Sequence, residues 1–309
     1  MYPMLTIPFP IAGLYWLRVE SSLVSDFARA VAGPDSSVDL FGAAIVIARI
    51  SGRAVDGHKL ARELDLFAEA VRDHAGDGAT DDQLAHAIDY QLFTVQGFHG
   101  NALDYANPEN SFIDAVVTRR TGLPITLSLV YMEVAERVGL RCEGIGYPGH
   151  FIVRAGNPEA DDDPLPGGHT AYTAYIDPFY QGARLDREEL LAGLRGKELG
   201  GARPESFLSA ITRRQILQRM LNNLHALFRQ QSDARAWRET VELLLQLQPW
   251  DTNLIGERGM LNYRLGRHEQ ALTDLEQYAA ATGEQALSTG ARRLLDDLRL
   301  RIRPAEEAS

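Results

Sequence analysis

The sequence predicts an α+β domain followed by an all-helical module, and three observations support this fold class. Apolar residues recur with helical spacing from about residue 38 to residue 138. Short strand-like runs follow between residues 142 and 177, and the last third repeats a helical pattern every 34 residues. Helices that precede consecutive short strands favour a fold in which helices pack on a mainly antiparallel sheet.

The helices of the first domain are bounded by glycines and capping residues. Two apolar faces, within residues 40–50 and 60–71, predict two helices that pack together. A third helix is expected from the N-cap Thr80 to about Phe93. The most regular apolar helix runs from Thr126 to Val138 and ends at a glycine, so we expect it to be the central helix of the domain.

The strand-like runs place a histidine and an aspartate on neighbouring strands. Cys142 to Tyr147 is the first run, and Pro148-Gly149 turns it into the second, which starts near His150. A polar loop precedes the third run, Ala171 to Asp177. A histidine oriented by an aspartate is two thirds of a nucleophilic triad, whose third member stands near a helix N-terminus in many enzymes.

Composition excludes several classes of function. The 31 basic and 42 acidic residues give a net charge of −11, which disfavours a nucleic-acid partner or an anionic membrane. Residues 205–309 are electrically balanced, so the negative charge lies in residues 1–204. A single cysteine, Cys142, excludes an intramolecular disulfide and a cysteine-cluster metal site, and it suits a reducing compartment such as the cytoplasm. No motif predicts a metal or a cofactor.

The N-terminal residues are apolar but do not form a convincing targeting segment. Residues 1–17 lack a basic start and are broken by three prolines. We therefore expect residues 1–17 to be disordered or loosely packed, and assign residues 1–37 to an N-terminal extension. No other run is apolar over the roughly 20 residues that a membrane-spanning helix needs.

The last third resembles tetratricopeptide repeats. Apolar and aromatic residues recur 34 positions apart, at Trp237, Val241 and Leu244 and then at Ala271, Leu275 and Tyr278. The predicted module covers residues 205–303, with a tail at 304–309. Only about two repeats are present, so we expect this module to pack on the first domain.

Four motifs in the first domain occur in an order that resembles a known family. They are Asn110-Ser111-Phe112, Arg119 to Ile125, Gly144 to Phe151 and Ile176 to Phe179. This order resembles the transglutaminase-like core of the SirB family, bacterial proteins in which tetratricopeptide repeats follow that core. The resemblance covers roughly residues 38–200, and the predicted domain is 38–204. It implies a papain-like fold with the nucleophile at a helix N-terminus.

The sequence departs from an active transglutaminase at that helix start. The resemblance implies a cysteine in the first turn, where the helix dipole lowers the thiol pKa, but the turn reads Pro124-Ile125-Thr126-Leu127-Ser128. Thr126 and Ser128 are possible nucleophiles, although a capping threonine and a packed serine explain them as well. Cys142 lies eight positions before His150, roughly 26 Å along an extended strand, and fits a small buried residue.

The predicted function is therefore binding rather than catalysis. We expect a non-catalytic protein that takes part in protein interaction or regulation, with His150 and Asp177 as a degenerate pair. Candidate binding residues are Asn110, Arg120, Pro124 and Tyr147 in the matching motifs, and Arg258, Arg264 and Arg267 in the repeats, which present cations to an acidic peptide.

Two alternatives remain open at this point. One is a hydrolase or an acyl or amide transferase that uses Thr126, Ser128 or Cys142 with His150 and Asp177. The other is an assembly scaffold, which the sequence does not separate from a regulatory binding protein. The partner is expected to be a protein or peptide, and the sequence does not predict the oligomeric state.

Overall fold

The structure is a computed structural model that describes residues 23–156, 173–198 and 200–302. Its first described segment lies within the predicted N-terminal extension, residues 1–37. Residues 23–30 are helical, and Leu23, Phe27 and Val31 are buried in the main core. These three side chains are spaced four residues apart, so one helical face carries all of them. Residues 1–22 lie outside the described residues.

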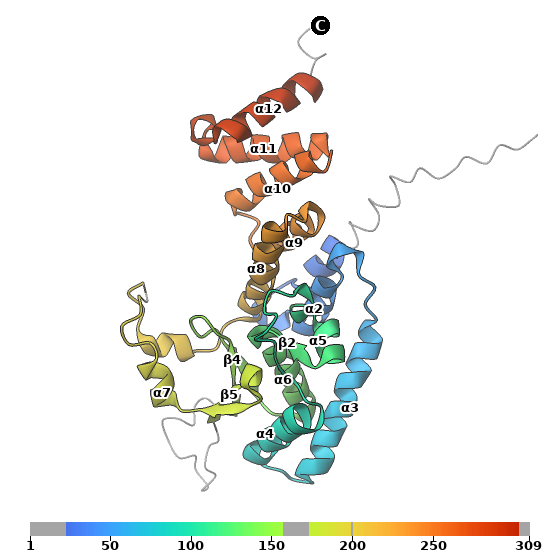
Figure 1. The fold of residues 1–309 in the computed structure, drawn as a ribbon, viewed down its shortest axis with the longest axis vertical. Helices are drawn as coiled ribbons and strands as arrows, with labels where there is room; N and C mark the ends of the chain where they lie inside the picture. Colours follow the sequence, from blue (N-terminus) through green and yellow to red (C-terminus); the bar gives the residue numbers. More distant parts are fainter. Residues whose placement is uncertain (1–22, 157–172, 199, 303–309) are drawn as a thin grey trace, which may run out of the picture.

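The first domain is built around α6, which other helices surround (Figure 1). α3, α4 and α5 each contact α6. The side chains of Asp39, Asp56 and Thr80 accept hydrogen bonds from backbone N–H groups at the starts of α2, α3 and α4. The helices are α2 (Leu40–Ala48), α3 (Gly57–Ala75), α4 (Asp81–Asp89), α5 (Ile113–Arg119) and α6 (Pro124–Val138). Short turns are η1 (Asp35–Ser37), η2 (Ile50–Gly52), the π-helical η3 (Tyr90–Val95) and η4 (Pro108–Asn110).

The sheet is antiparallel and lies between α6 and a smaller layer of helices (Figure 1). Its strands, in spatial order, are β3 (Cys142–Ile145), β4 (Ile152–Gly156), β5 (Thr173–Asp177) and β6 (Ala183–Leu185). Val153 and Ile176 face the main core, while Ile152 and Tyr175 join a second cluster with Leu190. Leu190 belongs to α7 (Arg187–Ala192), and η7 (Pro204–Leu208) packs in the same cluster. Alternation along the strands thus buries both faces.

A two-stranded parallel ladder sits beside the start of α6. β1 (His99–Gly100) pairs with β2 (Thr121–Gly122), and β1 also contacts the 3-10 turn η6 (Pro178–Tyr180) that follows β5. The ring of Phe179 lies where a side chain on Gly100 would be, about 2.4 Å from an added Cβ, so only glycine fits there. The ladder therefore brings the chain after Asp177 close to the segment that leads into α6.

The C-terminal module consists of helix pairs, the first of which is part of the main core. The helices are α8 (Arg213–Gln231), α9 (Ala234–Leu247), α10 (Thr252–Arg264), α11 (His268–Thr282), the short η8 (Glu284–Ala286) and α12 (Thr289–Ile302). Leu217, Leu221 and Leu224 of α8 and Leu243 and Leu244 of α9 are buried together with the helices of the first domain. α10 to α12 extend away from the sheet (Figure 1). The predicted fold class, an α+β core with an all-α repeat module, is confirmed.

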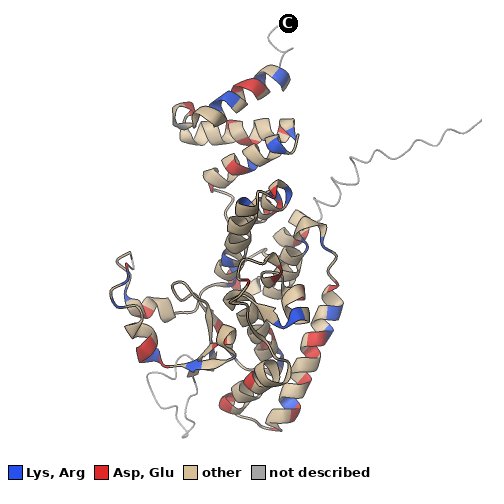
Figure 2. Cartoon of the chain, viewed as in Figure 1, with Lys and Arg blue, Asp and Glu red and all other residues tan. Residues whose placement is uncertain are grey.

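Charged residues of both signs are mixed on the helix surfaces, as α3 shows clearly in Figure 2. Within the described ranges, no helix is both long enough and apolar enough to cross a membrane.

Candidate functional site

His150 and Asp177 meet as a hydrogen-bonded pair at one end of the sheet. Pro148 and Gly149 form a turn that the N–H of His150 closes by donating to the carbonyl of Tyr147 at 2.9 Å, with Gly149 at φ 80°. The turn directs the His150 ring toward the end of β5, where its Nε2 lies 2.6 Å from Oδ2 of Asp177. The other oxygen of Asp177 accepts hydrogen bonds from the N–H groups of Phe179 and Tyr180. Asp177 therefore both orients His150 and caps η6.

The side chain of Thr126 forms hydrogen bonds with backbone groups at the start of α6. Its hydroxyl is fully buried, donates to the carbonyl of Asn110 at 2.7 Å, and accepts the N–H of Leu123 at 3.0 Å. This geometry satisfies the first turn of the helix, which has no acidic residue to cap it. A fully buried hydroxyl held between two backbone groups is not accessible to a substrate.

Neither Ser128 nor Cys142 forms a hydrogen bond with His150. The Ser128 hydroxyl is buried without a hydrogen-bond partner among the described residues. Cys142 pairs with Ala155 on β4, five residues along the chain from His150 and thus about 16 Å along an extended strand. Burial raises the pKa of the Cys142 thiol far above its ordinary value, so the thiolate is disfavoured at neutral pH.

The His150 ring is partly exposed and surrounded by aromatic side chains. The rings of Phe179 and Tyr180 lie 6.1 and 6.0 Å from it, and the Tyr105 ring lies 6.2 Å from Phe179. Tyr105 and Tyr180 are 53% and 66% exposed. From α8, Nη2 of Arg219 donates to the backbone carbonyl of His150 at 2.9 Å. These five residues, Tyr105, His150, Phe179, Tyr180 and Arg219, are called the His150 surface below.

The candidate binding residues of the sequence motifs mostly hold the fold together. Asn110 is fully buried, and its amide donates to the carbonyl of Asp104 and accepts from Asn101. Pro124 is buried at the first position of α6. The side-chain amide of Asn110 also donates to the carbonyl of Tyr105 at 3.4 Å. It therefore helps to position the backbone of Tyr105, a member of the His150 surface.

Arg120 and Tyr147 likewise make internal contacts. Arg120 has φ 57°, donates to Glu63 at 2.8 Å, and stacks over the rings of Phe67 and Phe98. The hydroxyl of Tyr147 donates to the carbonyl of Leu190 at 2.8 Å and so links the turn before His150 to α7. Neither side chain belongs to the His150 surface.

In the repeats, Arg258 is not the exposed cation that the sequence predicted. Its Nε and Nη2 form a two-point ion pair with Asp274, at 3.0 and 2.6 Å, and Asn262 donates to the same carboxylate. Arg267 is half-buried at the N-cap of α11, where its N–H donates to the carbonyl of Asn262. Arg264 is exposed. The buried Asn262 thus organises the contact between α10 and α11, and the three arginines do not form one cationic face.

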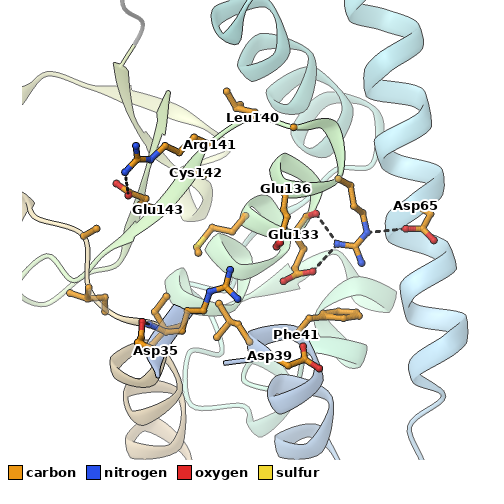
Figure 3. Close-up of a pocket in the computed structure, with 18 residues that line it drawn as sticks. Asp35, Asp39, Phe41, Asp65, Glu133, Glu136, Leu140, Arg141, Cys142 and Glu143 are labelled. Carbon is orange, nitrogen blue, oxygen red and sulfur yellow. Dashed lines mark hydrogen bonds and ion pairs between the residues drawn. The ribbon is translucent and has the colours of Figure 1, made fainter. Parts of the chain in front are cut away.

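A cavity of about 960 Å³ lies elsewhere, between α2, α6 and β3 (Figure 3). Three of its six acidic side chains are in ion pairs, since Arg137 binds Glu133 and Asp65, and Arg141 binds Glu143. Burial raises the pKa of Glu133, an effect that Arg137 opposes. No group of three potential metal ligands occurs in the part of the chain that the structure describes.

Comparison with known families agrees with this architecture. Residues 58–222 match the family described as the transglutaminase-like superfamily. The chain belongs to this superfamily. Residues 224–296 match the tetratricopeptide repeat. The two matches meet between residues 222 and 224, so the transglutaminase-like match includes the first half of α8 and Arg219.

Relatives of this transglutaminase-like chain occur in bacteria and in mammals. It is 30% identical over 265 residues to a UPF0162 protein of Xylella fastidiosa, covering 84% of this chain and 90% of that protein. A UPF0162 protein of Pseudomonas aeruginosa is 29% identical, with 68% and 72% covered. F-box only protein 21 of Mus musculus is 31% identical over 60% of this chain, but this match spans only 28% of that protein.

Three members of the His150 surface were not identified from the sequence of this transglutaminase-like protein. Tyr180 follows Asp177-Pro178-Phe179 directly, so its position next to a predicted site was an available signal. Tyr105 lies in a turn-rich segment and Arg219 on a helix of the repeat module, and neither carries a local pattern that links it to His150.

Proposed function

We propose that this protein is a non-catalytic member of the SirB family that binds a protein segment in the cytoplasm. The observation that carries the proposal is the environment of His150. No hydroxyl or thiol among the described residues forms a hydrogen bond with it, while Asp177 holds its ring in place. A histidine held by a carboxylate but with no hydroxyl or thiol hydrogen-bonded to it lacks the nucleophile that a triad base activates, which favours binding over catalysis.

The tetratricopeptide match supports a protein partner, because stacked helix pairs form extended surfaces that suit binding of other chains. Arg258 is neutralised by Asp274, which makes the His150 surface the better candidate for contact with a partner. The repeats then contribute through α8, which delivers Arg219 to that surface.

The alternative is a hydrolase or an acyl or amide transferase, and one observation favours it. The His150–Asp177 distance of 2.6 Å is that of a working base and its orienting carboxylate. Thr126 and Ser128 would have to leave buried positions to reach His150, and the half-buried Cys142 lies several residues away along the paired strands, which is why this alternative ranks second.

The experiment that tests the proposal is recovery of a partner by the full chain from a lysate of a related bacterium. Recovery is compared with that by Tyr180→Ser, by Arg264→Gln and by a chain that ends at residue 249. We expect one partner to be lost with Tyr180→Ser and kept with Arg264→Gln, because only Tyr180 lies on the His150 surface. Equal recovery by all four proteins would contradict the proposal.

A further inference from the structure

Arg219 is a cation without a carboxylate partner in the described residues. Its guanidinium donates a hydrogen bond from Nη2 to the carbonyl of His150 and stacks 5.5 Å from the centre of the Phe151 ring. By contrast, Arg120, Arg137, Arg154 and Arg258, which are comparably buried, each have a carboxylate within 3 Å. Arg213 and Arg214 of the same helix likewise have no carboxylate partner for their guanidinium groups in the described residues, and these groups donate to the carbonyls of Val38, Val31 and Gly33. What distinguishes Arg219 is that its backbone acceptor belongs to His150.

The guanidinium of Arg219 occupies space that is open because residue 146 is a glycine. A Cβ on Gly146 would lie 2.9 Å from Nη1 of Arg219, so a side chain there would push the guanidinium away. The N–H of Ile211 donates to the carbonyl of Gly144, which fixes the segment that enters α8 against the end of β3. Contacts with the first domain and with the start of α8 thus set the position of the Arg219 guanidinium.

The charge of Arg219 is poorly compensated there. Burial lowers the pKa of the guanidinium, which means that its surroundings disfavour the cation. Burial raises the pKa of the Tyr105 hydroxyl, and the positive charge of Arg219 partly offsets this rise. Arg219 and Tyr105 therefore lie within electrostatic reach of each other. A carboxylate that arrived beside them would supply the missing counter-charge.

The neighbours of Arg219 indicate what carries that carboxylate. Tyr105 and Tyr180 are mostly exposed aromatic rings that both contact the ring of Phe179, and Leu103, in the same segment as Tyr105, is fully exposed. Exposed tyrosines are typical of interaction surfaces, where an apolar ring and a polar tip meet one partner. An open arrangement of rings suits an extended peptide better than a small molecule, which binds in an enclosed pocket.

We infer that the His150 surface binds an extended peptide segment of a partner protein through an Asp or Glu side chain that pairs with Arg219, with apolar neighbours of that residue on Tyr105 and Tyr180. This inference rests on the proposed binding function and adds the class of segment recognised. The acidic residue occupies the uncompensated position of the surface. The side chains that flank the acidic residue cover the exposed tyrosine rings. Asp177 holds the His150 ring in a fixed position within the surface.

The test selects random 12-residue peptides displayed on phage against the full chain, followed by fluorescence-polarisation titration of synthetic peptides. We expect enriched peptides to share an Asp or Glu with an apolar residue within two positions. Replacement of that acid by its amide weakens binding about tenfold in the wild type but less than about twofold in Arg219→Gln, because the charge pair is already lost there.

Controls separate the possible failures. Arg229→Gln, an exposed arginine on the same helix as Arg219 but outside the surface, keeps wild-type affinity. Tyr180→Ser, at an exposed position, tests the surface without relying on the folding of Arg219→Gln. Peptides that lose affinity with Tyr180→Ser but contain no acid, or that need only a free C-terminus, overturn this inference and leave the proposed function intact. If no enriched peptide responds to Tyr180→Ser, both are overturned.

Discussion

At the level of single residues, Asp177 has two structural tasks. One carboxylate oxygen holds the His150 ring, and the other accepts two backbone N–H groups of η6. A carboxylate that is 4% exposed and fully hydrogen-bonded stabilises its surroundings whether or not the histidine takes part in chemistry. The persistence of this pair therefore does not require catalysis.

Replacing Asp177 by alanine should destabilise the protein by about 2–4 kcal/mol, because three hydrogen bonds to a buried carboxylate are lost. Urea unfolding monitored by circular dichroism measures this change. The matched control is Asp186→Ala, which removes an exposed helix cap at α7 and should cost about 1 kcal/mol. Equal effects of the two changes would show that Asp177 has no special structural role.

The thiol of Cys142 should react slowly in the folded protein. Its pKa is raised by burial, so the thiolate fraction at pH 7 to 9 is lower than that of a free cysteine. Iodoacetamide labelling followed by intact mass should therefore be slow throughout this pH range and become complete in urea. Rapid labelling of the folded chain at neutral pH would contradict a buried, inert thiol.

At the level of elements, the start of α6 differs from that of a transglutaminase-like enzyme in what its first turn presents. The resemblance implies a reactive group there, but Thr126 links the helix to the carbonyl of Asn110 instead. Asn110 in turn anchors the segment that carries Tyr105. The start of α6 is thus linked, through Asn110, to the segment that carries Tyr105 of the His150 surface.

Thr126 and Ser128 offer a matched pair of tests for this junction. Thr126→Val should cost about 1–3 kcal/mol, since buried backbone groups lose their partner, whereas Ser128→Ala should be near neutral because its hydroxyl has none to lose. Both free energies come from urea unfolding of the purified variants. A larger loss for Ser128→Ala than for Thr126→Val would contradict the assigned roles.

At the level of the whole molecule, the first helix pair of the repeat module belongs to the core of the first domain. α8 and α9 bury their leucines with the other core helices, and Glu239 of α9 accepts the N–H of Ser51 at 2.7 Å. Ser51 has φ 65°, a conformation that the buried carboxylate of Glu239 helps to hold. The two family matches therefore describe segments that share one core.

Truncation tests this shared core. A chain that ends at residue 249 should still unfold cooperatively, although with lower stability, because Val241 and Leu245 lose their contacts with α10. A chain that ends at residue 212 should lose cooperative unfolding, since its core lacks α8 and α9. Thermal unfolding by calorimetry distinguishes the two. A cooperative transition in the shorter chain would contradict the shared core.

The sequence predicted what depends on local pattern and missed what depends on distant contacts. The spacing of apolar residues predicted α6, and the turn at Pro148-Gly149 led to the pairing of His150 with Asp177. The ion pair of Arg258 with Asp274 joins two helices, and Arg219 reaches His150 from 69 positions away in the chain. Such contacts are set by helix packing, which no local pattern specifies.

The central claim is that His150 and Asp177 have no nucleophile to activate. The most direct measurement is intact mass after the folded full chain is exposed to a fluorophosphonate, which reacts with activated hydroxyls, and separately to iodoacetamide, which reacts with thiolates. We expect no adduct from either reagent beyond the level of the His150→Ala variant. A single adduct on Thr126, Ser128 or Cys142 that disappears in His150→Ala would contradict the central claim.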